Sequence, residues 1–144
     1  MGNEHHNGAP ASNGSPWRVF VVDDERVIAT TLAAILQLNG FVADSFVRPF
    51  DALDAARANA PDLLISDVVM PDISGVELAI QIKAICPDCK VLLFSGQAAT
   101  ADLLLAAREQ GHDFQLLSKP VHPTELLAQV GKLVHKPTTD SVAE

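Results

Sequence analysis

The sequence predicts an α/β protein in which five parallel strands form one sheet with helices on both faces. Short apolar runs alternate with longer segments of helical periodicity, a pattern typical of parallel strands joined by right-handed crossovers. The strand candidates are apolar throughout, as in the run WRVFVV, which indicates that both faces of the sheet are covered. The length of 144 residues fits a single domain.

Five strands and five helices account for the chain between residues 17 and 135. The strands are expected at 17–22, 41–46, 63–66, 91–94 and 114–117, and the helices at 26–39, 49–59, 74–85, 98–110 and 123–135. Gly40 and Gly111 suit the left-handed position that follows a helix. Ser74 and Glu77 form a capping-box pattern, and Pro123 suits the first position of a helix.

The segments outside these limits are polar. Residues 1–16 indicate a flexible leader and residues 136–144 a C-terminal tail, so the domain is expected at 17–135. No segment approaches the roughly 20 apolar residues of a membrane span, which favours a cytoplasmic protein. The net charge of −8 disfavours binding to nucleic acid or to anionic lipid. Proteins, cations and small molecules remain as partners.

Polar side chains follow four of the five predicted strands. They are Asp23, Asp24 and Glu25 after the first strand, Asp67 after the third, Ser95 after the fourth and Lys119 after the fifth. Ligands of open α/β sheets bind beyond the carboxyl ends of the strands, so these side chains form the candidate site. Three neighbouring carboxylates repel one another, and a lysine together with a hard divalent cation supplies the counter-charge. The sequence therefore predicts a Mg²⁺ site at this edge of the sheet.

Four motifs in the chain resemble those of the receiver domain of two-component response regulators. They are VVDDE at 21–25, ISDVVMPDISGVEL at 65–78, LLFSG at 92–96 and SKP at 118–120. The motifs occur in this order at the ends of four predicted strands, which makes the resemblance specific over about residues 17–135. It implies a doubly wound, flavodoxin-like sheet with the strand order 2-1-3-4-5.

The resemblance also implies a role for each acidic residue. Asp67 would be the phosphoacceptor, a carboxylate nucleophile that forms an acyl phosphate. Asp24 would hold Mg²⁺ directly and Asp23 partly through water. Asp67 and the backbone carbonyl of Val69 would complete the protein ligands.

Lys119 and Ser95 would act on the phosphoryl group itself. By the same resemblance, Lys119 would neutralise the charge that develops during transfer, and Ser95 would donate a hydrogen bond to the attached group. Gly96 would leave room beside it. The peptide bond between Lys119 and Pro120 is usually cis in this family.

One position departs from the family pattern. Three residues before Lys119 the family usually has an aromatic or histidine side chain that moves when the phosphoryl group is attached, but this chain has Leu116. The departure affects the output switch rather than the transfer chemistry, because this position contacts neither metal nor phosphate in the family pattern. Phe114 would take over the aromatic role if the strand register differed.

Simpler structural roles are also open to some of these residues. Asp23 and Asp24 could cap the helix that begins near Arg26, and Asp67 could be a turn residue. Cys86 and Cys89 form a CxxC pattern, but it lies at a helix C-terminus, where the helix dipole raises rather than lowers a thiol pKa. The pattern therefore favours a structural role for the two cysteines. No nucleotide-binding glycine motif is present.

The function expected is that of a stand-alone receiver. It would accept a phosphoryl group from a histidine kinase or a histidine phosphotransfer protein, catalysing its own phosphorylation and dephosphorylation. It would then change a protein-binding surface on the last two helices and the last strand, or relay the phosphoryl group. The alternative is a receiver-like protein-binding module that acts without phosphorylation.

Overall fold

The computed structural model describes residues 16–96 and 100–134. The strands are β1 (Arg18–Val22), β2 (Val42–Phe46), β3 (Leu63–Asp67), β4 (Lys90–Ser95) and β5 (Gln115–Ser118). The helices are α1 (Arg26–Leu38), α2 (Pro49–Ala58), α3 (Gly75–Ile85), α4 (Thr100–Glu109) and α5 (Pro123–Val134). The five predicted strands and five predicted helices are all present.

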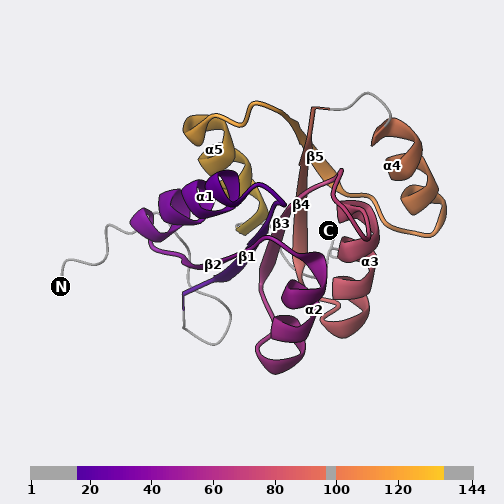
Figure 1. The fold of residues 1–144 in the computed structure, drawn as a ribbon, viewed down its shortest axis with the longest axis horizontal. Coiled ribbons are helices and arrows are strands. Elements are labelled where there is room, and N and C mark those ends of the chain that lie inside the picture. The colour runs from indigo at the N-terminus through magenta and orange to yellow at the C-terminus, as the bar shows by residue number, and fades with distance from the viewer. Residues whose placement is uncertain (1–15, 97–99, 135–144) are drawn as a thin grey trace, which may run out of the picture.

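The strands form one parallel sheet in the order β2-β1-β3-β4-β5. Figure 1 shows α1 and α5 on one face of the sheet and α2 and α3 on the other. This arrangement confirms the predicted fold class and strand order. The order reverses at β1, and the carboxyl ends of β1 and β3 therefore lie at the switch point where ligands of such sheets bind.

Apolar side chains fill both faces of the sheet. Along β1, Val19 and Val21 pack with residues of α1 and α5, whereas Phe20 and Val22 pack with residues of α2 and α3. All four side chains are at most 1% exposed. This two-sided burial explains why the strand is apolar at every position rather than at alternate positions.

Glycines end α1 and α4 as expected. Gly40 and Gly111 have φ angles of 92° and 93°, a conformation that other residues rarely adopt. The next residue donates back into each helix: the Phe41 N–H to the Leu36 carbonyl at 3.1 Å, and the His112 N–H to a carbonyl of α4 at 2.9 Å. Both ends are therefore Schellman motifs.

The predicted element limits need small corrections. Asp67 and Ser95 are the last residues of β3 and β4 rather than the first residues after them, because each still pairs with the neighbouring strand. Ser74 is the N-cap of α3, and its hydroxyl accepts a hydrogen bond from the Glu77 N–H at 3.1 Å. Residues 1–15, 98–99 and 135–144 of the predicted leader, helices and tail lie outside the described residues.

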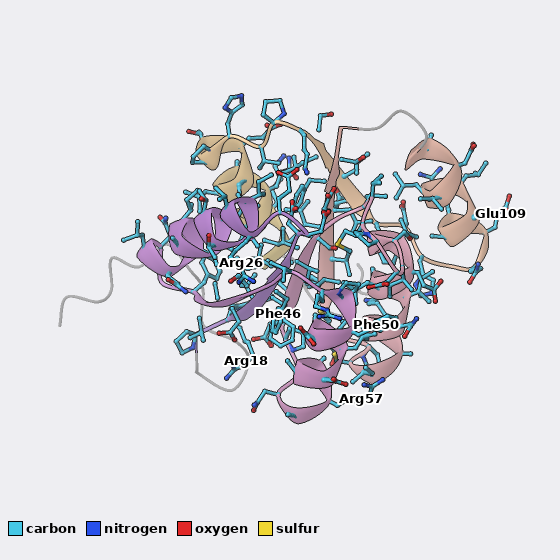
Figure 2. All side chains as sticks on the ribbon, in the orientation of Figure 1. Arg18, Arg26, Phe46, Phe50, Arg57 and Glu109 are labelled. Carbon is cyan, nitrogen blue, oxygen red and sulfur yellow. The ribbon has the colours of Figure 1, made fainter. Side chains whose placement is uncertain are left out.

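Helix α4 packs less closely than the other helices. Among its side chains that the structure describes, only Ala107 is buried, whereas Leu103 and Leu105 are exposed. Figure 1 shows α4 at the edge of the molecule beside α3, and Glu109 at its end points away from the sheet in Figure 2. Within 16–96 and 100–134, no helix is long and apolar enough to cross a membrane.

Candidate functional site

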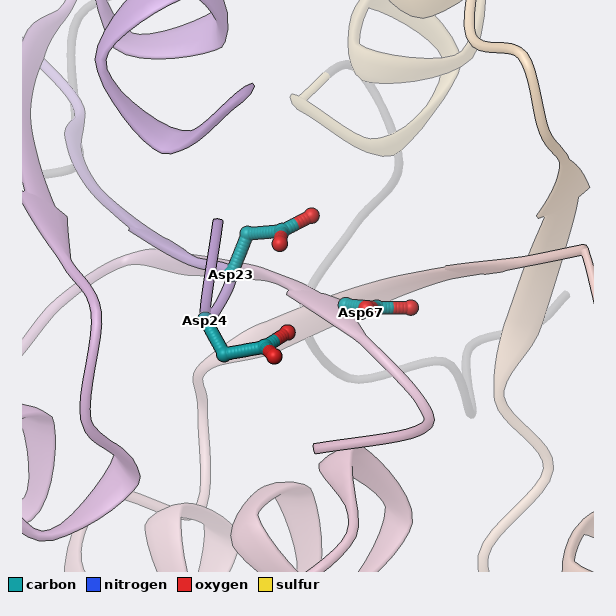
Figure 3. A group of neighbouring side chains, drawn as sticks. All are labelled: Asp23, Asp24 and Asp67. Carbon is teal, nitrogen blue, oxygen red and sulfur yellow. The ribbon is translucent and has the colours of Figure 1, made fainter. Parts of the chain in front are cut away.

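The predicted site residues meet at the carboxyl edge of the sheet. Asp23 and Asp24 follow β1, Asp67 ends β3, Ser95 ends β4 and Lys119 follows β5. Carboxylate oxygens of the three aspartates lie within 4.8 Å of one another. Figure 3 shows the three side chains side by side. Asp23 and Asp67 are buried, whereas Asp24 is exposed. The cluster is thus an acidic pocket that opens to solvent on the side of Asp24.

Lys119 is the cation that faces this cluster. Its Nζ lies 3.4 Å from Oδ2 of Asp23 and 3.3 Å from Oδ2 of Asp67. The same Nζ lies 5.2 Å from the centre of the Phe94 ring, which packs beneath it. The Lys119 N–H donates to the Ser95 carbonyl at 3.1 Å, and the peptide bond to Pro120 is cis, as the resemblance implied.

One lysine does not fully compensate the buried carboxylates. Burial raises the pKa of Asp23 and of Asp67 above the usual value, although Lys119 acts in the opposite direction on both. Burial by itself would lower the pKa of Lys119, but the two carboxylates raise it overall, so the lysine stays charged. The pocket therefore keeps an excess of negative charge, and its oxygen ligands are those that a hard divalent cation prefers.

Asp23 has a local structural role as well as a place in the cluster. Its Oδ1 accepts a hydrogen bond from the Glu25 N–H at 2.8 Å, and its own N–H donates to the Phe46 carbonyl at 3.1 Å. Glu25 is the N-cap of α1 and makes no side-chain capping bond. Asp23 therefore stabilises the turn before α1 rather than capping the helix itself. Its other oxygen, Oδ2, faces Lys119.

Gly75 is a residue of the site that the sequence did not single out. A Cβ atom at this position would overlap the backbone carbonyl of Asp67 and approach Oγ of Ser66. The Gly75 N–H donates to the Val68 carbonyl at 2.7 Å, and the Ser66 hydroxyl donates to the Asp67 carbonyl at 2.9 Å. The first turn of α3 therefore holds the backbone of Asp67 in place, and only glycine fits there.

Val69 lies beside Asp67, and Gly96 lies beside Lys119. The backbone N–H of Val69 donates a hydrogen bond to the Asp67 carboxylate, so the backbone of Val69 lies beside the acidic cluster. Ser95 is only 7% exposed. At Gly96 an added Cβ would meet Cβ of Lys119 at 3.6 Å, an ordinary contact, so an alanine would also fit there.

Comparison with known proteins identifies the family of the chain. Residues 19–131 match the response regulator receiver domain. The chain belongs to this family. The transcriptional regulatory protein CreB of Escherichia coli K12 is 39% identical over 118 residues, which cover 82% of this chain and 51% of CreB. The response regulator MprA of Mycolicibacterium vanbaalenii is 29% identical over 128 residues, covering 89% of this chain and 54% of MprA.

Solved receiver structures agree with this result. The BeF3-activated receiver domain of DrrB from Thermotoga maritima superposes on the chain with a TM-score of 0.71 at 30% identity. The superposition covers 83% of this chain and 98% of that domain. The receiver domain described here spans about half the length of the curated relatives it matches.

The position that departs from the family pattern lies away from the acidic cluster. Leu116 pairs with Leu93 across the sheet and is 42% exposed, on the opposite side of β5 from Lys119. Phe114 is half-buried, packs with the core on the α2 and α3 side and stacks on His112 with ring centres 5.5 Å apart. In this register, Leu116 rather than Phe114 holds the family position in the receiver domain.

A mostly apolar cavity of about 430 Å³ adjoins the site on the side of α1. Lys119 forms part of its wall, so the cavity and the acidic cluster share one side chain. Its lining comes from α1, β4 and the segment before α5, namely Ile28, Thr31, Leu32, Phe94, Lys119, Pro120 and Val121. The receiver domain thus has an apolar surface directly beside its charged pocket.

Proposed function

We propose that this receiver domain accepts a phosphoryl group on Asp67 from a phosphohistidine of a histidine kinase or a histidine phosphotransfer protein. The observation that carries the proposal is the contact of Asp67 with Lys119 inside a three-carboxylate pocket. Asp23 is a poorer acceptor, because it is fully buried and one oxygen is held by the Glu25 N–H. Asp24 is not among the carboxylates that pair with Lys119 in the described structure.

The donor set of the pocket fits Mg²⁺. Asp23, Asp24 and Asp67 would hold the ion, together with the backbone carbonyl of Val69, and water would fill the remaining positions. Bound Mg²⁺ supplies positive charge to the oxygens of the phosphoryl group during transfer. Burial raises the pKa of Asp23 and of Asp67 although Lys119 lowers both, so a cation beside them would favour their charged forms.

The transfer step uses three side chains of the chain. An oxygen of Asp67 attacks the phosphorus, the bond between phosphorus and the donor imidazole nitrogen breaks, and an acyl phosphate forms. Lys119 lies close enough to Asp67 to pair with an oxygen of the transferred group. Ser95 would donate its hydroxyl hydrogen to another of these oxygens once the group is attached.

The partners proposed are proteins. The net charge of −8 disfavours nucleic acid and anionic membranes as ligands of this chain, and a cytoplasmic location suits exchange with a kinase. The apolar cavity beside Lys119 supports docking of a donor protein, because an apolar side chain of the donor would fill it while the phosphohistidine reaches Asp67. We place the domain at residues 17–135, which contain the family match at 19–131.

Incubation with acetyl phosphate and Mg²⁺ tests the assignment of Asp67. Intact-mass measurement should show a gain of one phosphoryl group in the natural chain and none in Asp67→Asn. Asp54→Asn is the matched control, because Asp54 is an exposed aspartate on α2 that pairs only with Arg57 in the described structure. This control should gain the group as the natural chain does. Phosphorylation of Asp67→Asn would refute the assignment by showing a different acceptor. No mass gain in the natural chain would refute the proposal and favour a binding module.

A further inference from the structure

The turn between α3 and β4 holds both cysteines of the chain. Cys86 is the C-cap of α3, and Cys89 precedes β4. The Cys89 N–H donates to the Cys86 carbonyl at 3.0 Å, which closes a β-turn with Pro87 and Asp88 at its centre. Such a turn keeps the Cα atoms of its first and last residues within about 7 Å, a separation that a disulfide bond can span. Both thiols are free.

The two thiols contact each other but differ in exposure. The two thiols interact with each other. Each donates a hydrogen bond to a backbone carbonyl at 3.3 Å, Cys86 to that of Ile82 and Cys89 to that of Lys90. Cys86 is partly exposed, whereas Cys89 is 1% exposed and belongs to the core on the α2 and α3 side. A reagent in solution can therefore reach Cys86 more readily than the buried Cys89.

The charges around the turn also make Cys86 the more reactive thiol, as its greater exposure does. Nζ of Lys83 donates to the carbonyls of Pro87 and Cys89 at 3.0 and 2.9 Å, so an ammonium group lies over the turn. The neighbouring Cys89 thiol lowers the pKa of Cys86, and Lys83 lowers it further, against the effects of partial burial and of Asp62. The Cys86 thiol raises the pKa of Cys89, as does burial.

We propose that Cys86 and Cys89 form a reversible intrachain disulfide, with Cys86 as the attacking thiol and Cys89 as the resolving thiol. The oxidant is a disulfide such as oxidised glutathione. The Cys86 thiolate attacks one of its sulfurs, the sulfur–sulfur bond breaks, and one glutathione thiolate leaves. Cys89 then releases its proton to solvent and attacks Sγ of Cys86, and the second glutathione thiolate leaves. Two protein thiols are oxidised while one external disulfide is reduced to two thiols.

The bond would connect two elements that also reach the phosphorylation site. Helix α3 begins at Gly75 against the backbone of Asp67, and β4 ends at Ser95. A disulfide between the end of α3 and the residue before β4 would hold the opposite ends of these two elements together. Oxidation should therefore slow amide exchange in the turn 86–89, where it removes local opening.

Mass spectrometry of the full chain in glutathione buffers tests the proposal. After acid quenching and alkylation, the natural chain in oxidised glutathione should have lost two hydrogens and carry no alkyl group, and reduced glutathione should restore two alkylated thiols. Cys89→Ser should stop at a mixed disulfide with glutathione on Cys86. Cys86→Ser should remain a free thiol while folded, because Cys89 is buried.

Two further measurements separate reactivity from folding. In the natural chain, a brief treatment with iodoacetamide should label Cys86 before Cys89, and phosphorylation by acetyl phosphate checks that each variant is folded. Lys83→Gln should slow alkylation of Cys86 several-fold at neutral pH and shift its pH profile upward. A natural chain that stays a dithiol in oxidised glutathione, or equal glutathione adducts on the two serine variants, would overturn the proposal.

Discussion

Helices α1 and α4 have similar lengths but very different relations to the sheet. Helix α1 buries Ala29, Leu32, Ala33 and Leu36 against the sheet, whereas α4 buries only Ala107 among its described side chains. The strands beside them differ in the same way. Four of the five residues of β1 are buried, but only Leu117 is buried in β5. The acidic pocket therefore lies between a closely packed side, formed by α1 and β1, and a loosely packed side, formed by α4 and β5.

The difference in packing separates the residues of the transfer chemistry from the elements that can move in response to it. Asp23 and Asp67 must hold their oxygens in place. Asp23 directly follows β1 and Asp67 ends β3, and both strands are buried on both faces. Lys119 follows β5, which is exposed over most of its length. Elements with few buried contacts rearrange at low cost in free energy. A group attached to Asp67 can thus move the α4 and β5 side more easily than the α1 side.

The largest expected effect compares the same substitution on the two helices. Leu36→Ala on α1 removes a fully buried side chain and should lower the free energy of unfolding by about 2–5 kcal/mol. Leu105→Ala on α4 alters a side chain that is 52% exposed and should change it by less than about 0.5 kcal/mol. Urea denaturation measures both. Similar losses in the two variants would mean that α4 is as firmly packed as α1.

A second pair of substitutions compares two glycines. Gly75→Ala places a methyl group on the Asp67 carbonyl and should lower the free energy of unfolding by about 1–3 kcal/mol, with less phosphorylation by acetyl phosphate. Gly131→Ala on α5 meets no atom of residues 16–96 or 100–134 within 4 Å. It should raise the free energy of unfolding by up to about 1 kcal/mol, because alanine favours the helix. Equal stability and equal phosphorylation in Gly75→Ala would contradict the contact.

Sequence patterns predicted the sheet well and the packing of α4 poorly. The apolar runs of the strands and the residues Gly40, Ser74 and Pro123 mark element ends by local chemistry. Helix α4 contains Leu103 and Leu105, which periodicity cannot distinguish from core residues of α1, because it shows which side chains share a face but not what covers that face.

Two features of the site were beyond sequence reasoning for a related reason. The need for Gly75 arises from the close approach of the Asp67 carbonyl, a tertiary contact that leaves no mark beyond a glycine after the N-cap Ser74. The reactive environment of Cys86 depends on Lys83 folding over the turn. By contrast, the acidic cluster was predictable, because strand ends in a parallel sheet meet at one edge whatever the packing around them.

A smaller effect concerns the buried charge of Asp67, at the end of the well-packed strand β3. Burial raises the pKa of Asp67, so the folded chain binds its proton more tightly than the unfolded chain. The associated stability is fully present below the unfolded pKa of 3.8 and is lost as the pH rises through the higher folded pKa. Asp67→Asn, which keeps the site neutral, should therefore stabilise the metal-free chain at pH 7 by ~1 kcal/mol, the scale of a typical point substitution.

The pH dependence of this gain distinguishes it from a general packing effect. Thermal unfolding in EDTA should show the gain at pH 7 and its disappearance as the pH falls below 3.8, where the natural carboxyl is also protonated. Asp54→Asn on the exposed face of α2 should leave the free energy of unfolding at pH 7 unchanged. A gain in Asp67→Asn that persists at low pH would show that burial of charge is not its cause.

The smallest effect is a difference in response between the two helices. Beryllium fluoride, a phosphoryl mimic, should change amide exchange in α4 and β5 and leave exchange in α1 nearly unchanged. Ser95 and Lys119 lie at the strand ends that border α4 and α5, whereas four buried residues fix α1 against the sheet. Leu116 has neither a ring to fill a pocket nor a polar group to favour exposure, so the change in α4 should be partial. Leu116→Phe should bind the mimic equally and respond more strongly, since a ring drawn between α4 and β5 would bury more apolar area. Equal changes of amide exchange in α1 and α4, or changes confined to the loops after β1 and β3, would contradict the idea that loose packing of α4 and β5 permits the response.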